Sequence, residues 1–209
     1  MNQPDMSLKD WIAPARTALL LIDMQVDFAS PDGGLGRDGI DMTAPLAAVK
    51  QAETLAVAAR KAGVPCVFVR LVTREKDETE FFQEWKTRRG SHGPPLCREG
   101  TPGADFAGPQ PGPRELVFSK KRYNAFAGTG LDAALRDMGV DTLVVAGLTT
   151  ECCIDSSVRD AFERDYHVYV VSDATACYQP DLHTAALRAL KLNCAGLVTA
   201  AQAIASWNL

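Results

Sequence analysis

Residues 142–154 read TLVVAGLTTECCI, and this stretch decides the fold. Its first part, Thr142 to Ala146, is a short apolar run of the kind that forms a buried strand. Apolar residues then recur at helical spacing, as Ile154, Val158, Ala161 and Phe162. One face of the second element is therefore expected to be buried, while its charged residues face solvent. The pattern predicts a strand, a tight turn and an amphipathic helix.

Two cysteines, Cys152 and Cys153, lie at the start of this helix. The first turn of a helix has unsatisfied N–H groups and the positive end of the macrodipole, and both favour a thiolate over a thiol. The sequence therefore predicts a cysteine nucleophile at this turn. A disulfide between the two neighbours, acting as a redox switch, is an alternative, but a bond between adjacent residues is strained.

Strand-like runs alternate with helical patterns along the chain. The runs are residues 17–22, 65–71, 115–119, 142–146, 167–171 and 196–198. Between them, Thr43 and Gly63 mark the two ends of an alanine-rich helix. Thr129 and Asp132 predict a capping box for a helix that Gly139 ends. Alternation of this kind is typical of an α/β fold, in which helices wrap a parallel sheet.

Length and composition favour a single domain over residues 1–209. A chain of 209 residues, 46% of them hydrophobic and 23% charged, can form one full core, and no linker divides it. A formal net charge of -4 argues against binding to nucleic acid. The sequence has neither the pattern of a signal peptide nor an apolar segment long enough to cross a membrane. We therefore expect a cytoplasmic protein with no nucleic-acid or membrane partner.

Residues 73–114 break the alternation and predict a lid or an insertion. The segment is charged at first and then rich in glycine and proline, with Pro94, Pro95, Pro102, Pro109, Pro111 and Pro113. Long irregular segments in compact domains tend to be lids, binding loops or contact surfaces. Only residues 78–86 have a helical pattern, with Phe81, Phe82 and Trp85 on one face. These aromatic side chains either pack the insertion against the domain or contact a substrate.

Three reactive side chains stand where predicted strands end. Asp23 follows the first strand, Lys120 the third and Cys153 the fourth. In an open parallel sheet ligands bind beyond the carboxyl ends of the strands, so these residues are expected to meet at one edge. Taken singly, Asp23 could cap a helix, Lys120 could be a solvated charge and Cys153 could be a core residue. Together they predict a catalytic site, because an aspartate after an apolar run is costly to bury unless it is paired.

Three segments resemble the signature motifs of a known family. They read LLIDMQVDF at residues 20–28, KKRYNAF at 120–126 and GLTTECCI at 147–154. In this order they are similar to the isochorismatase-like cysteine hydrolases, and the resemblance extends from Thr17 to Ala176. It implies a Rossmann-like, three-layer α/β/α domain with a mostly parallel six-stranded sheet. It also implies assembly into a homo-oligomer, a dimer or a tetramer, and a catalytic triad of aspartate, lysine and cysteine.

The resemblance assigns the triad to Asp23, Lys120 and Cys153. The spacing K-x-R-Y selects Lys120 over Lys121, and the isoleucine that follows the family nucleophile selects Cys153 over Cys152.

The resemblance also implies a cis peptide bond between Leu148 and Thr149. In the family this bond directs the N–H of Thr149, together with that of Cys153, towards the substrate oxygen as an oxyanion hole. Three further residues are expected to line the pocket, or else to pack around the first and third strands: Gln25, Phe28 and Tyr123.

Differences between this sequence and other members of the family narrow the range of reactions that we expect. Nicotinamidases carry an Asp-x-His metal motif with a further histidine after the second strand, where this chain reads LVTREKD at residues 71–77. No metal and no cofactor are therefore expected. The histidines are scattered, at His92, His167 and His183, and His183 is expected on a helix surface. Isochorismatases proper lack a cysteine at the nucleophile position, so Cys153 indicates cleavage of a C–N bond.

The predicted activity is hydrolysis of a small amide, ureido or N-carbamoyl compound through a thioester intermediate. Alternatives stay open at this point. The chain could be an isochorismatase-type or nicotinamidase-like hydrolase of another small molecule. It could also be a non-catalytic domain that binds a small ligand, although the first strand leads into Asp23-Met24-Gln25 and not into a glycine-rich phosphate loop.

Cations are concentrated between residues 70 and 98, beside the predicted edge. They are Arg70, Arg74, Lys76, Lys86, Arg88, Arg89 and Arg98. Some are expected to pair with neighbouring acids on a solvated face. The alternative is that arginines bind a substrate carboxylate, because the planar guanidinium can hold both oxygens, with a neighbouring subunit completing the lid. Arg70 and Arg74 are the predicted clamp, since they follow the second strand directly.

Overall fold

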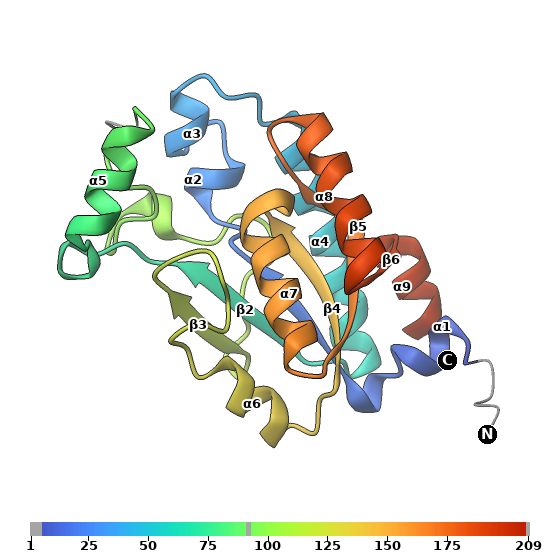
Figure 1. Cartoon of the computed structure of the whole chain (residues 1–209). Coiled ribbons are helices and arrows are strands. Elements are labelled where there is room, and N and C mark those ends of the chain that lie inside the picture. The colour runs from blue at the N-terminus through green and yellow to red at the C-terminus, as the bar shows by residue number, and fades with distance from the viewer. Residues whose placement is uncertain (1–5, 91–92, 208–209) are drawn as a thin grey trace.

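A six-stranded sheet forms the centre of the computed structural model, which describes residues 6–90 and 93–207. The strand order is β3-β2-β1-β4-β5-β6, and every pairing is parallel (Figure 1). The strands are β1 (Thr17–Ile22), β2 (Cys66–Leu71), β3 (Leu116–Lys120), β4 (Thr142–Leu148), β5 (His167–Ala176) and β6 (Gly196–Val198). The predicted α/β class and parallel sheet are confirmed.

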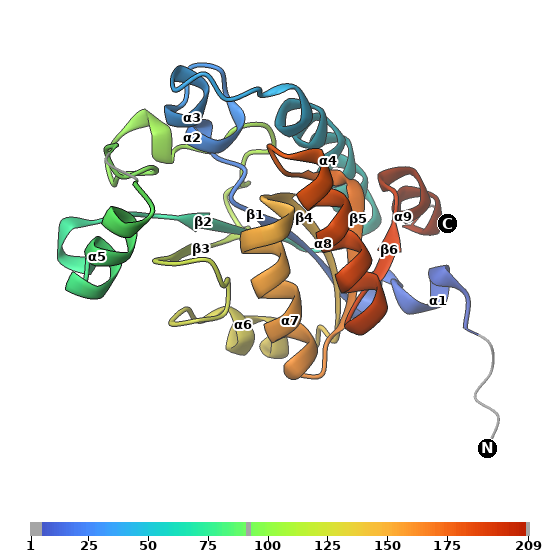
Figure 2. The same cartoon turned by 45° about the horizontal axis from the view of Figure 1, so that its top comes forward.

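Helices cover both faces of the sheet, which gives the predicted three layers (Figures 1 and 2). One layer consists of α4 (Thr43–Ala62) and α9 (Ala200–Trp207), and the other of α6 (Leu131–Asp137), α7 (Asp155–Glu163) and α8 (Pro180–Asn193). The side chains of β1 alternate between the two cores. Leu19 and Leu21 join the core under α4, whereas Leu20 and Ile22 join the core under α6 and α7. This alternation explains why the strand is apolar throughout.

Short elements complete the structure. They are α1 (Leu8–Trp11), η1 (Pro14–Arg16), α2 (Val26–Ala29), α3 (Gly34–Arg37), η2 (Glu75–Asp77), α5 (Glu80–Arg88), η3 (Pro102–Ala104) and η4 (Thr150–Ile154), the last a single π-helical turn that leads into α7. Among the helices that the structure describes, none combines the length and the apolar character that a bilayer crossing requires.

The segment 73–114 leaves the sheet between β2 and β3. It contains η2, α5 and η3, and α5 corresponds to the helix predicted over residues 78–86. Figures 1 and 2 both show α5 standing apart from the helices of the two layers, at the end of the sheet where β2 finishes. We call the part of the chain from Glu75 to Arg88 the lid helix segment.

Two details of the predicted helices are wrong. Phe162 was expected on the buried face of α7, but it is 49% exposed, because that face is centred on Ser157, Val158 and Ala161 and Phe162 lies beside it. The capping box of α6 is not formed either. Gly130 is the N-cap residue, and the side chain of Asp132 accepts a hydrogen bond from the hydroxyl of Tyr166 at 2.8 Å.

Gly147 permits a close approach between the two central strands. It pairs with Ile22, its φ is 141°, and a Cβ atom there would lie 2.0 Å from the carbonyl oxygen of Ile22. Only glycine fits this position without displacement of β1. The approach sets the separation between the end of β1, which leads into Asp23, and the end of β4, which leads into Cys153.

We predict that Gly147→Ala lowers the free energy of unfolding by about 3 kcal/mol, because the new methyl group meets backbone that cannot move away cheaply. Gly63→Ala is the matched control. Gly63 also has a positive φ, 76°, but its Cβ would meet nothing within 4 Å, so a loss of only about 1 kcal/mol is expected. Urea unfolding measures both, and equal losses would contradict the steric argument.

Candidate active site

Asp23, Lys120 and Cys153 meet at the carboxyl edge of the sheet. The Nζ atom of Lys120 lies 2.6 Å from Oδ2 of Asp23 and 3.4 Å from Sγ of Cys153. All three residues are buried, and the side chains of Asp23 and Lys120 have no exposed surface. The third donor position of the ammonium is used as well, because Nζ donates to the carbonyl oxygen of Arg122 at 2.9 Å.

The sheet order explains how three distant segments supply this cluster. Asp23 follows β1 with a positive φ of 52°, and its N–H donates to the carbonyl of Val69 on β2 at 2.8 Å. Lys120 is the last residue of β3 and pairs in register with Leu71 on β2. Neighbouring strands are about 4.8 Å apart, so a side chain from β3 must cross β2 to reach the end of β1. Lysine is long enough to do so.

Burial and charge act against each other at this ion pair. Burial raises the pKa of the Asp23 carboxyl, although the ammonium of Lys120 and the nearby thiol of Cys153 oppose that shift. Burial by itself would lower the pKa of Lys120, but the charges of Asp23 and of the cysteine outweigh it and raise the pKa. Apart from the ion pair, neither carboxylate oxygen of Asp23 accepts a well-directed hydrogen bond from the residues that the structure describes. The carboxylate can therefore receive a proton.

Burial and neighbouring charges also act on the thiol of Cys153. The hydrogen bond to Cys152, burial and the carboxylate of Asp23 together raise the pKa of the Cys153 thiol well above its usual value, against the opposing charge of Lys120. The same hydrogen bond lowers the pKa of Cys152. These influences oppose the thiolate that the helix N-terminus was expected to favour, whereas the ammonium of Lys120 supports it.

The turn that carries Cys153 has the predicted cis peptide bond between Leu148 and Thr149. The N–H groups of Cys152 and Ile154 both donate to the carbonyl of Thr149 at 3.1 Å, so the two neighbours of Cys153 share one acceptor. The hydroxyl of Thr149 donates to the carboxylate of Glu151 at 2.9 Å. These hydrogen bonds between residues of the turn stabilise its conformation.

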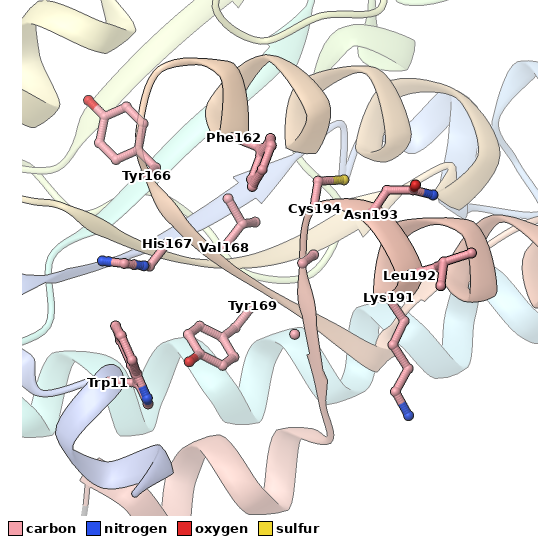
Figure 3. Close-up of a pocket in the computed structure, with 12 residues that line it drawn as sticks. Trp11, Phe162, Tyr166, His167, Val168, Tyr169, Lys191, Leu192, Asn193 and Cys194 are labelled. Atoms are coloured by element: carbon pink, nitrogen blue, oxygen red, sulfur yellow. The ribbon is translucent and has the colours of Figure 1, made fainter. Parts of the chain in front are cut away.

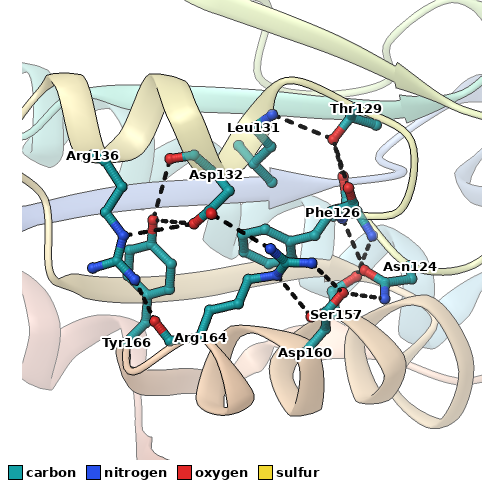
Figure 4. Close-up of polar contacts among 11 residues, drawn as sticks. Asn124, Phe126, Thr129, Leu131, Asp132, Arg136, Ser157, Asp160, Arg164 and Tyr166 are labelled. Atoms are coloured by element: carbon teal, nitrogen blue, oxygen red, sulfur yellow. Dashed lines mark hydrogen bonds and ion pairs between the residues drawn. The ribbon is translucent and has the colours of Figure 1, made fainter.

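Ser157 connects the turn to the loop after Lys120, a link that the sequence analysis missed. Its hydroxyl donates to the carbonyl of Cys153 at 2.6 Å and accepts from the N–H of Ala125 at 2.9 Å. Asn124 reinforces the link by donating to Asp160 on α7 at 2.6 Å (Figure 4). The detectable signal is the spacing of four residues between Cys153 and Ser157, because a serine hydroxyl in a helix reaches the carbonyl one turn back.

Beyond this link, charged side chains tie α6 to α7. Arg164 pairs with Asp160 at 2.7 Å and with Asp132 at 3.4 Å, and Tyr166 donates to Asp132 (Figure 4). These contacts fix α7, and with it the turn that carries Cys153, against the neighbouring helix.

His183 contacts the same turn from α8, where it was expected on the surface. Its Nδ1 atom lies 2.8 Å from the hydroxyl oxygen of Thr150, which is fully buried. Burial lowers the pKa of His183, and the charge of Glu151 opposes the shift.

Gln25 is fully buried, and its amide contacts backbone. Nε2 donates to the carbonyls of Leu71 and Ala104, both at 2.9 Å, and Oε1 accepts from the N–H of Leu71 at 2.8 Å. Of the two alternatives in the sequence, packing around the strands is the one observed. Gln25 thus holds the end of β2 and the loop at residue 104 beside Asp23.

A cavity of about 230 Å³ lies near the triad, although Asp23, Lys120 and Cys153 are not among its lining residues. Its walls include Phe28, Leu71, Phe82, Trp85, Leu96 and Tyr123. Leu71 is the register partner of Lys120, and the pKa of Tyr123 is raised by burial and by the charges of Cys152 and Cys153. Phe28 and Tyr123 thus both line this cavity, and their contact with a substrate stays a prediction.

The predicted arginine clamp does not lie at this cavity. Arg70 places its guanidinium 5.8 Å from the ring centre of Phe106 and donates to the hydroxyl of Ser119, because its position on β2 directs it to the opposite face from Val69. Arg74 pairs with Glu99 at 2.7 Å and with Asp77 at 3.5 Å. Arg74 thus pairs with acidic residues at the surface, as the alternative interpretation of these cations predicted.

A second hollow, of about 350 Å³, lies at the other edge of the sheet (Figure 3). His167 and Gly196, the first residues of β5 and β6, line it together with Trp11 and Tyr169. It therefore borders the amino ends of the strands, away from the triad.

No group of three or more histidine, cysteine, aspartate or glutamate side chains is arranged to hold a metal ion within residues 6–90 and 93–207. His92 lies outside these residues.

The family profile, the sequence relatives and the structural neighbours of this chain agree with one another. The profile of the isochorismatase domain family matches residues 17–202. The ureidoacrylate amidohydrolase RutB of Methylobacterium radiotolerans is 34% identical over 189 residues, which cover 83% of this chain and 72% of that protein. The structure of a cysteine hydrolase from Pseudomonas syringae pv. phaseolicola has a TM-score of 0.82 and 25% identity, and the match covers 99% of this chain and 98% of the other. N-carbamoylsarcosine amidase from Thermoplasma acidophilum has a TM-score of 0.70 at 25% identity, with 88% and 96% covered.

Removal of either charge of the buried pair should be costly. We predict that Lys120→Met and Asp23→Asn each lower the free energy of unfolding by about 3–5 kcal/mol, because each leaves an uncompensated buried partner. The double variant should lose less than the sum of the two. Asp141→Asn, which breaks the half-exposed pair with Arg16, is the control and should cost less than about 1 kcal/mol. Additive losses at Asp23 and Lys120 in urea unfolding would count against the pairing.

His183 should make stability depend on pH. Because its folded pKa is lowered, the unfolded chain takes up a proton below its own pKa of about 6.5 while the folded protein stays neutral. The contribution of neutral His183 to stability is therefore fully present above about pH 6.5. It is lost as the pH falls from about 6.5 to the folded pKa. The difference in unfolding free energy between wild type and His183→Gln should narrow over this range. Parallel curves for the two proteins would contradict the prediction.

Proposed function

This chain belongs to the isochorismatase domain family, and we propose that it is a cysteine hydrolase that cleaves a C–N bond of a small amide or ureido compound. The observation that carries the proposal is the contact of one ammonium with both a carboxylate and a thiol, at 2.6 Å and 3.4 Å, in a buried site beside a cavity. The names of the relatives, a ureidoacrylate amidohydrolase and an N-carbamoylsarcosine amidase, support the choice of bond.

The first step is activation of the nucleophile. Asp23 accepts the proton of the Cys153 thiol, and the raised pKa of the carboxyl suits it to act as a base closer to neutral pH. The ammonium of Lys120 then lies beside the new thiolate and stabilises it. The thiolate attacks the carbonyl carbon, so a C–S bond forms and the carbonyl oxygen becomes an anion.

The N–H groups of Thr149 and Cys153 are the proposed oxyanion hole. The carbonyl of Thr149 accepts from the neighbours of Cys153, Cys152 and Ile154, so the N–H of Cys153 has no part in that bond. Collapse of the tetrahedral intermediate breaks the C–N bond, and Asp23 returns its proton to the leaving nitrogen. Water, deprotonated by Asp23, then hydrolyses the thioester and regenerates the thiol.

This scheme uses protein side chains and water, and we propose that the enzyme requires no metal or cofactor. The support is the sequence after β2, LVTREKD at residues 71–77, which lacks the histidine found in metal-bearing relatives.

We further propose a homo-oligomer, a dimer or a tetramer, in the cytoplasm. The support for self-association is β3, an edge strand on which Leu116 and Val117 are 39% and 40% exposed.

Substitution of each of the two adjacent cysteines tests the assignment of Cys153 as the nucleophile. Cys153→Ala should abolish turnover, whereas Cys152→Ala should keep most of it, because Lys120 contacts the sulfur of Cys153 at 3.4 Å. Ammonia release from small amides, ureido acids and N-carbamoyl amino acids measures the activity. Equal loss of activity in both variants would mean that the nucleophile has been assigned to the wrong cysteine.

A further inference from the structure

The cavity beside the triad is positioned to hold the part of the substrate that does not react. It is bounded by Leu71, which pairs with Lys120, and by Tyr123, which follows Lys120 by three residues. Whatever occupies this space therefore lies next to the carbonyl group that the thiolate attacks.

The walls of the cavity are aromatic. Phe82 and Trp85 of α5 stack with their ring centres 5.6 Å apart and an angle of 13° between the planes. Tyr123 meets Trp85 edge to face at 6.5 Å, and Phe28 of α2 also lines the cavity. The faces of Phe82 and Trp85 already contact each other, Arg122 and Arg89, so a ligand ring would meet these side chains edge to face.

The lid helix segment is fastened to the residues that follow Lys120, so these walls are preformed. Lys121 pairs with Asp77 at 2.7 Å. Arg122 places its guanidinium 3.9 Å from the ring centre of Phe82 and donates to the carbonyl of Asp77. A preformed cavity binds its ligand without the cost of ordering a loop.

The charged groups at the cavity neutralise each other. Lys86 and Glu78 both line it and form an ion pair at 3.2 Å, with side chains 24% and 20% exposed. A carboxylate on the substrate would have to replace Glu78 as the partner of Lys86 and would then face the displaced acid as a like charge. The pair thus opposes an acidic substrate.

We infer that the substrate carries an uncharged aromatic group beside its scissile amide or ureido bond, in contrast to an acid such as ureidoacrylate. This inference rests on the proposed function for the identity of the reacting bond. The aromatic group lies against Trp85, Phe82 and Tyr123, and its amide carbon reaches Sγ of Cys153.

Matched pairs of substrates test the inference. Phenylacetamide and malonamate differ only in a phenyl group against a carboxylate, as do benzylurea and N-carbamoylglycine. We expect kcat/KM for ammonia release to be at least about tenfold higher for the aryl member of each pair. A preference for the acidic members would overturn the inference and leave the proposed function standing.

Variants of the lid helix segment test which residues cause the preference for aryl substrates. Trp85→Ala should raise KM for phenylacetamide about tenfold with little change in kcat, because a large part of the apolar wall is lost. Phe81→Ala is the control, since Phe81 lies on the same helix but is 68% exposed, and it should change neither constant. Glu78→Gln should lower KM for malonamate by releasing Lys86. An unchanged KM in Trp85→Ala would overturn the inference.

Binding separates this inference from the proposed function. Calorimetry with the Cys153→Ala protein should show phenylacetamide binding that is weakened about tenfold when Trp85→Ala is added. Binding of this kind without turnover by the wild type would support the aromatic cavity and remove the proposed reaction. Absence of binding would overturn the inference.

Discussion

The buried ion pair between Lys120 and Asp23 is the interaction on which the site depends. Two charges without exposed surface are stable only with close partners, because an isolated ion in the interior costs several kcal/mol. The pair meets this requirement at 2.6 Å, and the remaining donors of the ammonium contact Cys153 and the carbonyl of Arg122. The cost of separating these charges fixes the ends of β1 and β3 relative to each other. It also keeps a base and a cation beside a thiol that burial would otherwise leave inert.

The strands and turns around the ion pair also fix the relative positions of Asp23, Lys120 and Cys153. Gly147 lets β4 approach β1, and Ser157 joins the turn of Cys153 to the loop that follows Lys120. That loop continues into Lys121 and Arg122, which hold the lid helix segment. One short stretch of chain therefore both supplies the buried cation Lys120 and holds the helix that lines the cavity.

The fold was largely predictable from local pattern. Apolar runs bounded by helical segments located all the strands, since a central parallel strand must be apolar on both faces. Errors arose where a residue depended on a partner far away in the chain. Asp132 matched a capping box, but it bonds to Tyr166. Phe162 matched the apolar spacing of α7, but it lies beside the buried face. Gln25 resembled a pocket residue, but its amide holds the backbone of Leu71 and Ala104.

The sequence by itself determined the parallel sheet, the three residues that meet at its edge and which of the two adjacent cysteines lies beside Lys120. It could do so because strand ends are local features and parallel strands bring their carboxyl ends together. Only the tertiary structure decided the surroundings of the Cys153 thiol, since its contact with Cys152, its burial and the nearby Asp23 together raise its pKa. It also decided which lid residues line the cavity. Arg70 and Arg74 follow β2 directly, yet strand alternation and pairing with Glu99 turn them away, while Trp85 enters from a helix whose position depends on contacts with residues 121–123.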